Sequence, residues 1–235
     1  MRGIFVTATD TGVGKTVLAA AFCAALAERG KKVAAFKPVV TGMDEEPDEW
    51  PRDHELLAQV ATVRQEPSDV APLSFGPAVS PHLAAEMAGD TIEPHELAAA
   101  ARSAGDDADA LVVEGVGGIL VPLTPGYLVR DLAVELDLPL LIVARPGLGT
   151  INHTLLTIEA ARAVGLDVAG VVITPWPDEP DEMVRSNKET IERFGSVNVT
   201  GLPATTPDDL AKAAADLPID DWMGTSGPDP QVSGD

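Results

Sequence analysis

The residues with the clearest chemical potential lie at positions 9–16, where the chain reads Thr-Asp-Thr-Gly-Val-Gly-Lys-Thr. This stretch follows the apolar run 4–6 and precedes an alanine-rich segment, so a strand, a glycine turn and a helix are expected in that order. Backbone N–H groups of such a turn converge on phosphate oxygens, while a lysine and a hydroxyl supply a positive charge and a magnesium ligand. The pattern predicts a loop that binds a nucleoside triphosphate, with Lys15 and Thr16 in these two roles, although Thr9 stands where the usual pattern has glycine.

Two more charged residues stand where strands are expected to end. Lys37 follows the apolar run 32–36, and Glu114 ends the run 110–114, just before a glycine-rich turn at 115–118. Phosphoryl transfer works mainly by positioning and by neutralising charge, so a second lysine and an acidic magnesium ligand are what it needs. The simpler alternatives are an exposed lysine after a strand and a solvated glutamate beside a glycine turn.

The elements that must position these residues alternate along the chain. Apolar runs with β-branched residues predict buried strands at 3–7, 32–36, 110–114, 139–144, 168–174 and 197–202. Helical patterns occupy 16–29, 54–63, 94–104, 128–136, 152–164 and 181–194, and Ser80-Pro81 marks the start of another helix. The expected fold is α/β with three layers, a mostly parallel central sheet and helices on both faces. Ligands of such folds bind at the carboxyl ends of the strands.

Composition narrows the possible partners. A chain of 235 residues with 45% apolar residues fits a single domain, expected over 1–223, followed by a disordered acidic tail at 224–235. The net charge of −21 argues against nucleic acids and anionic membranes as partners, and it suggests a protein from a high-salt cytoplasm. With a single cysteine, Cys23, and an N-terminus that begins as a strand, a cytoplasmic location is expected.

Taken together, these segments resemble the dethiobiotin synthetase family, a group of phosphate-loop enzymes. The likeness runs from about residue 3 to 217, and its specific parts follow one another in the same order as in that family. They are Thr9-Asp10-Thr11 with Val13-Gly14-Lys15-Thr16, Lys37-Pro38-Val39 with Thr41-Gly42, Ser80-Pro81-His82, Val113-Glu114-Gly115 with Gly117-Gly118, and Gly149 with Ile151-Asn152-His153. Members of this family also lack the first glycine of the loop.

The resemblance implies an ATP-dependent ligase that needs Mg²⁺. In this family one amine of 7,8-diaminononanoate captures CO2 as a carbamate, which ATP converts to a carbamic-phosphoric anhydride before the second amine closes the ring of dethiobiotin. The family acts as a homodimer, with the substrate carboxylate at a helix start of the other subunit, here residues 149–152.

The resemblance also assigns roles to individual residues. It makes Lys37 and Lys15 catalytic, and it gives Thr16, Asp53 and Glu114 as magnesium ligands. The implied nucleotide-binding residues are Gly12, Val13, Gly14, Lys15, Thr16, Val17, Asp53, Glu114, Gly115, Val116, Gly117, Thr174, Pro175, Leu202, Pro203 and Ala204. The implied substrate-binding residues are Thr11, Lys37, Thr41, Ser80, Pro81, Gly117, Gly118, Gly149, Thr150 and Asn152.

Some positions leave alternatives open. Asp53 and Asn152 could each be the N-cap of the helix that follows. Gly12 replaces a glutamate and Thr174-Pro175 replaces an Asn-Asp pair found in many members, so the contact with the nucleotide base is not accounted for.

Two other classes compete with this interpretation. A MinD-like or ParA-like regulatory ATPase would share the loop, but Asp10 stands where such proteins carry an additional lysine. An amide synthetase of the cobyrinic acid type would need a glutaminase domain for which the chain is too short.

Overall fold

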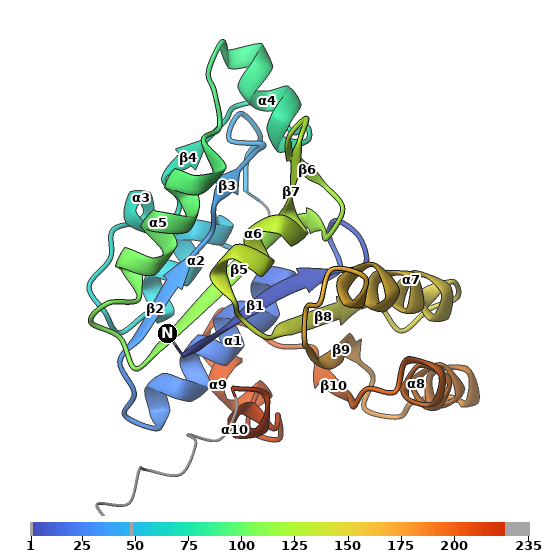
Figure 1. Ribbon diagram of the computed structural model, residues 1–235. Helices are drawn as coiled ribbons and strands as arrows, with labels where there is room; N and C mark the ends of the chain where they lie inside the picture. The colour runs from blue at the N-terminus through green and yellow to red at the C-terminus, as the bar shows by residue number, and fades with distance from the viewer. Residues whose placement is uncertain (1, 48, 224–235) are drawn as a thin grey trace, which may run out of the picture.

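The core of the protein is one six-stranded parallel sheet (Figure 1). The computed structural model describes residues 2–47 and 49–223, and the tail expected at 224–235 lies outside them. Along the sheet the order is β10-β9-β8-β1-β5-β2, and every neighbouring pair is parallel. The strands are β1 Gly3–Ala8, β2 Val33–Phe36, β5 Ala110–Gly118, β8 Leu140–Ala144, β9 Val168–Trp176 and β10 Val199–Pro203. All six were predicted from their apolar runs, and the α/β fold class is confirmed.

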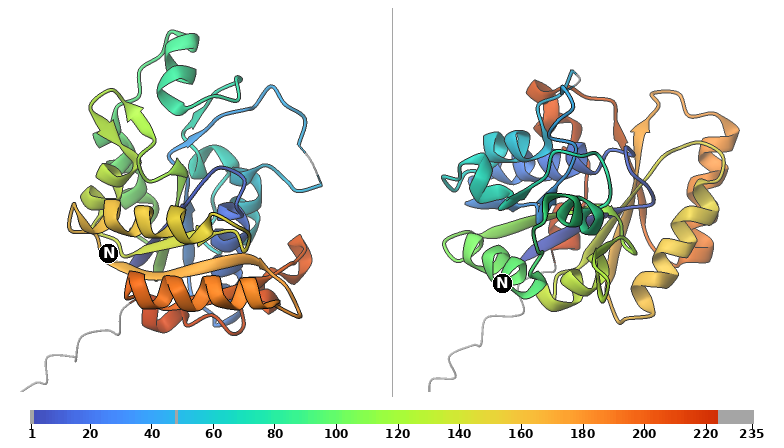
Figure 2. Two further views of the ribbon diagram at one scale, coloured as in Figure 1. Left: turned by 90° about the vertical axis from the view of Figure 1, so that its right-hand side faces the viewer. Right: turned by 90° about the horizontal axis from the view of Figure 1, so that it is seen from above.

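Helices cover both faces of this sheet and make it the middle of three layers (Figures 1 and 2). One face carries α5 Pro94–Ala104, α6 Val129–Leu136, α7 Thr150–Arg162 and α8 Glu182–Gly195, while α4 Pro81–Ala88 belongs to the same apolar cluster but lies beyond the sheet. The opposite face carries α1 Lys15–Glu28, α2 Asp53–Val60, α3 Pro67–Val70, α9 Leu210–Ala213 and α10 Ile219–Trp222. Successive strand residues alternate between the layers, since Phe5 packs into the first cluster and Ile4 and Val6 into the second.

Short elements outside the main sheet were not predicted. They include the four-residue helices α3, α9 and α10, the strand β3 Val39–Val40, which pairs with β4 Leu73–Ser74, the hairpin of β6 Pro122–Thr124 and β7 Tyr127–Leu128, and the 3-10 turn η1 Pro207–Asp209. Runs of two to four residues carry no periodicity that a sequence pattern can register. Helix α4 packs against β6 and projects with the hairpin beyond the main sheet (Figure 1). None of the helices in the described part of the chain is both long and apolar enough to cross a membrane.

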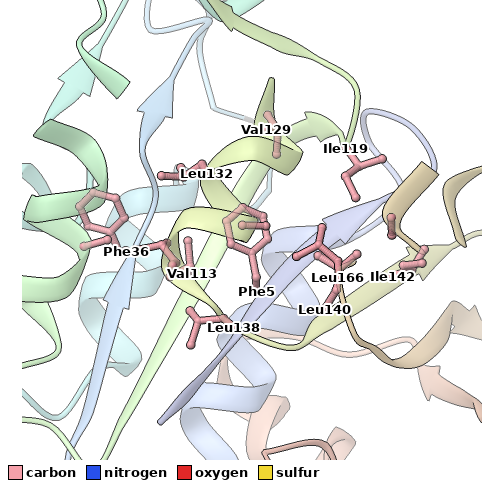
Figure 3. Packing of buried hydrophobic residues seen from close by; sticks show 14 of the residues in the cluster. Phe5, Phe36, Val113, Ile119, Val129, Leu132, Leu138, Leu140, Ile142 and Leu166 are labelled. Carbon is pink, nitrogen blue, oxygen red and sulfur yellow. The ribbon is translucent and has the colours of Figure 1, made fainter. Parts of the chain in front are cut away.

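Phe5 stands at the centre of the first apolar cluster. Its ring on β1 lies among side chains from neighbouring strands and from α6, including Val113 and Leu140 (Figure 3), and none of it is exposed. Because the sheet cannot collapse around the space left behind, Phe5→Ala should lower the free energy of unfolding by about 3–5 kcal/mol. Phe194→Ala, on α8 with 67% of the residue exposed, is the matched control. Urea unfolding of both variants should separate them clearly, and equal losses would contradict this account of the core.

The hypothesis of a high-salt cytoplasm makes a second prediction about stability. Only 16 basic residues balance 37 acidic ones, so the folded chain repels itself in dilute buffer. Raising KCl from about 0.01 M to about 1 M shortens the screening length from ~30 Å to ~3 Å and should raise the melting temperature. Sucrose, which favours compact states without screening charge, is the control. A melting temperature that KCl leaves unchanged would contradict the hypothesis.

Candidate active site

The loop between β1 and α1 has the backbone form that a phosphate-binding turn requires. Gly12 has φ 72° and Gly14 has φ 99°, a region that residues with a side chain rarely adopt. A Cβ atom on Gly14 would lie only 2.8 Å from the Thr174 side chain, so this glycine also permits close packing against the end of β9. The loop thereby brings the start of α1, with Lys15 as its first residue, to the carboxyl end of the sheet.

Four elements bring a cluster of polar side chains together beside this loop. The Lys37 ammonium, just after β2, lies 2.6 Å from a carboxylate oxygen of Glu114 on β5 and 2.6 Å from one of Asp53 at the start of α2. The Thr16 hydroxyl on α1 donates to the same Glu114 oxygen at 2.9 Å. The structure therefore joins Lys37, Thr16, Asp53 and Glu114, which are far apart in sequence, into one group.

Burial and charge pairing oppose each other at these groups. Glu114 has no exposed surface, and burial raises the pKa of its carboxyl group despite the attraction of Lys37. Burial by itself would lower the pKa of Lys37, but Glu114 and Asp53 more than offset it, so the pKa of this lysine is raised. Burial also opposes the lowered pKa of Asp53, which Lys37 brings about. Lys37 is therefore a permanent cation at neutral pH and can stabilise charge, but it cannot serve as a base.

Lys15 is less firmly paired than Lys37. Its ammonium donates to the backbone carbonyl of Asp10 at 3.3 Å. It also interacts electrostatically with Glu114, which attracts it, and with Lys37, which repels it. Burial lowers the pKa of Lys15. Among the described residues the Asp10 carbonyl is the only hydrogen-bond partner of the Lys15 ammonium, which can therefore turn toward an anion that enters the loop.

The donor set fits a magnesium ion. Mg²⁺ binds oxygen ligands, and in phosphate-transfer sites it takes one or two carboxylates together with phosphate oxygens. Thr16, Asp53 and Glu114 supply such oxygens, and the second carboxylate oxygen of Glu114 is buried without a hydrogen-bond partner. In the described ranges no three His, Cys, Asp or Glu side chains converge on one point.

Two cavities meet at the phosphate loop. The first, of about 790 Å³, contains the charged cluster and is also lined by Thr11, Thr41, Ser80, Pro81, Val116 and Gly117. The second, of about 330 Å³, is lined by Val13, Thr174, Pro175, Pro203 and Ala204 among others. Gly12, Gly14 and Val17 border both. The structure therefore gathers most of the residues that were assigned to substrate and nucleotide around two cavities that share the phosphate loop as a wall.

Several predicted site residues lie elsewhere, and their roles stay predictions. Leu202 is fully buried in the core, and Gly115 packs closely against Phe5. Gly118 pairs with Ala8 inside the sheet. None of these three residues lines either cavity, although a backbone contact with a ligand is compatible with their positions.

The segment at 149–152 also lies outside both cavities of this chain. Gly149 has φ 87° and precedes α7, Thr150 is buried, and Asn152 stands within the first turn of the helix. The alternative of Asn152 as N-cap is wrong, since Gly149 holds that place. Asp53 is not an N-cap either: Arg52 precedes the helix, and the Asp53 carboxylate turns to Lys37 because a buried cation attracts it more strongly than backbone N–H groups.

The nucleotide-binding residues assigned from the sequence do not include Trp50, Arg145 and Thr205, which line the second cavity. Trp50 lies in the acidic loop before α2 and borders both cavities, and Arg145 directly follows β8. The available signals were an isolated tryptophan in a stretch of acidic residues and an arginine at a strand end in a chain that has few basic residues.

The central strand of the parallel sheet leads through a glycine loop into a helix that begins with Lys15 and Thr16. This arrangement defines a phosphate-loop nucleotide-binding protein. Residues 2–205 match a family model described as AAA domain. The ATP-dependent dethiobiotin synthetase BioD of Bacillus subtilis (strain 168) is 39% identical over 203 residues, which are 86% of this chain and 87% of the relative. That of Anaeromyxobacter dehalogenans is 42% identical over 218 residues, 92% and 96% of the two chains. The chain belongs to the family of ATP-dependent dethiobiotin synthetases.

Solved structures agree on the fold. The MinC:MinD cell division protein complex of Aquifex aeolicus gives a TM-score of 0.55 at 18% identity, with 91% of this chain and 86% of the other covered. The ParA family ATPase of Chlorobium tepidum TLS gives 0.53 at 15% identity, with 94% and 98% covered. At such low identity these likenesses show the fold alone.

The buried ion pair can be tested by a double-mutant cycle. Lys37→Met removes the cation and leaves the Glu114 carboxylate without compensation, so it should lower the free energy of unfolding by about 3–5 kcal/mol. Adding Glu114→Gln removes the stranded charge and should restore much of that loss. Urea unfolding of wild type, both single variants and the double variant measures the coupling. Strictly additive losses would show that the pair does not interact as the geometry requires.

Proposed function

We propose that this chain uses ATP and CO2 to convert 7,8-diaminononanoate to dethiobiotin, with release of ADP and phosphate. The observation that carries the proposal is the position of Lys37, Thr16, Asp53 and Glu114 on the floor of the larger cavity, directly beside the phosphate loop. A ligand in that cavity would lie against the terminal phosphate of a nucleotide in the loop. Membership of the dethiobiotin synthetase family supports the same conclusion.

The chemistry asks the protein chiefly for position and charge. One substrate amine adds to CO2 and loses a proton to give a carbamate, whose oxygen attacks the γ-phosphorus while the bond to ADP breaks. The second amine then attacks the carbonyl of this mixed anhydride, the carbon–oxygen bond to the phosphoryl group breaks, and the five-membered ring closes with release of phosphate and of the amine's proton. Holding both amines beside one phosphate makes each step effectively intramolecular, which is the main contribution of a closely fitting cavity.

Lys37 and Lys15 have different parts in this scheme. Lys37 is fixed by two carboxylates at 2.6 Å and would stabilise the charge that develops on the transferred phosphoryl group. Lys15, held only by a loop carbonyl, would turn to the β- and γ-phosphates. Magnesium, when held by Thr16, Asp53 and Glu114, would add positive charge at the same phosphates.

The rest of the cavity offers places for the diamine. Thr41 supplies a hydroxyl, Ser80 and Pro81 bring the start of α4 to the rim, and Gly117 leaves backbone groups accessible. A homodimer would add residues 149–152 of a second copy as the site for the substrate carboxylate, since free N–H groups at a helix start favour an anion. Leu148, adjacent to this segment, is 82% exposed and would be covered in such a dimer.

A regulatory ATPase of the MinD or ParA kind shares the fold but is less well supported. Solved structures of such ATPases are 15–21% identical to this chain, whereas the dethiobiotin synthetases are 39–42% identical. Asp10 also occupies the place of the additional lysine that such ATPases carry.

Product formation distinguishes the two functions. Purified protein mixed with 7,8-diaminononanoate, bicarbonate and Mg-ATP should give dethiobiotin, detected by mass spectrometry, and phosphate release should depend on the diamine. Hydrolysis of ATP at a rate that ignores the diamine would overturn the proposal.

Variants of the two lysines test their separate parts. Lys37→Met should lose ring closure by about 100-fold or more in kcat, the scale typical of losing one preorganised charge-stabilising group, while nucleotide binding largely remains. Lys15→Ala should lose both. Thermal melts of each variant confirm that the comparison is made on folded protein. An unchanged kcat in Lys37→Met would show that Lys37 is not a catalytic residue.

A further inference from the structure

The smaller cavity lacks the amide and carboxylate side chains that usually form hydrogen bonds with the edge of a nucleotide base. Its lining is made of Thr11, Gly12, Val13, Gly14, Val17, Trp50, Arg145, Thr174, Pro175, Pro203, Ala204 and Thr205. None of these residues has an amide or carboxylate side chain, which are the groups that bind adenine through paired donors and acceptors. The Thr205 hydroxyl already donates to the carbonyl of Thr206. Recognition of a base here must therefore come from other groups.

Trp50 offers an aromatic surface in a fixed place. It is half-buried, packs against the apolar cluster on the α1 side of the sheet and borders both cavities. The guanidinium group of Arg52, two residues further on, donates to the carbonyl oxygens of Met43 at 3.1 Å and Glu45 at 2.8 Å. These bonds join the residues before Trp50 to the start of α2, and the Trp50 side chain itself packs on the apolar cluster.

Arg145 offers donors on the same cavity. It follows the last residue of β8, its side chain is exposed, and no ion pair or hydrogen bond engages it within residues 2–47 and 49–223. The turn that carries it is fixed, because the Asn187 side chain on α8 donates to the carbonyl of Pro146 at 2.9 Å. In a chain with 37 acidic side chains, an arginine that faces a cavity without an acidic partner is available to a ligand.

We propose that Trp50 and Arg145 hold the nucleotide base, Trp50 by stacking on its ring and Arg145 by donating to its acceptor atoms. This inference rests on the proposed function, since it concerns the nucleotide that the same site uses. Every base has a ring face and at least one acceptor, so a site of this kind accepts purines and pyrimidines alike. The structure thus assigns to this chain a base site of low selectivity.

Binding without the diamine tests the proposal directly. The affinities of ATP, GTP and CTP, each compared with that of inorganic tripolyphosphate, isolate what the base contributes. In wild type the three nucleotides should bind within roughly 10-fold of one another, since stacking tolerates any base. Trp50→Leu should weaken all three by roughly 5- to 150-fold while leaving tripolyphosphate unchanged, the range expected for one stacked base. Trp50→Phe should restore most of the loss.

Arg145→Met should weaken the three nucleotides but not tripolyphosphate, and Arg64→Met, an exposed arginine outside both cavities, is the matched control. Equal affinities of wild type, Trp50→Leu and Arg145→Met for every nucleotide would overturn the proposal, as would a variant that loses tripolyphosphate equally. A strong preference of wild type for ATP alone would overturn the low selectivity.

The two proposals fail separately. If dethiobiotin forms but neither variant changes nucleotide binding, the base site is wrong and the function stands. If the variants behave as expected but no dethiobiotin forms, the base site stands and the function is wrong.

Discussion

The structure depends on a cation buried between two carboxylates. Taking Lys37 and Glu114 out of water costs several kcal/mol for each ion, and only close pairing with additional hydrogen bonds offsets that cost. The two ions meet at 2.6 Å, Asp53 lies at the same distance from the ammonium, and the Thr16 hydroxyl satisfies the shared carboxylate oxygen. Because the four residues come from β2, β5, α1 and α2 or their ends, this pairing fixes how those elements meet at the carboxyl edge of the sheet.

The same arrangement explains why the site sits where it does. The central strand β1 can lead directly into the phosphate loop because Gly14 tolerates both a positive φ and the Thr174 side chain against it. The loop then forms a wall shared by two cavities, one with the charged cluster and one with mostly apolar lining. A nucleotide across this wall would place its phosphates beside the charges, where phosphoryl transfer needs positive charge, and its base in the other cavity.

The main strands and the charged residues at their ends could be predicted from the sequence because buried segments have a recognisable local pattern of apolar residues. Strands that are covered on both faces appear in the sequence as continuous apolar runs. A charged residue at the end of such a run, such as Lys37 or Glu114, is not accounted for by packing of the core and therefore indicates a functional site. Residues whose position depends on loop conformation have no local sequence pattern of this kind. Trp50 lies in a loop whose carbonyl groups bind the Arg52 guanidinium, and no local pattern in the sequence indicates that this loop borders the cavity. Asp53 reads locally as an N-cap, yet the distant Lys37 decides its orientation.

Net charge makes the position of the few basic residues significant. A chain of charge −21 repels anionic ligands at long range, and a nucleoside triphosphate and a carboxylate substrate are both anions. Two of its lysines, Lys15 and Lys37, are nevertheless withdrawn from the surface, where they would improve solubility and reduce self-repulsion, and placed at the cavity floor. In low dielectric surroundings their attraction for phosphate is less screened than it would be at the surface. The site therefore relies on short-range attraction after encounter rather than on long-range steering, and salt that screens the overall repulsion would favour the encounter itself.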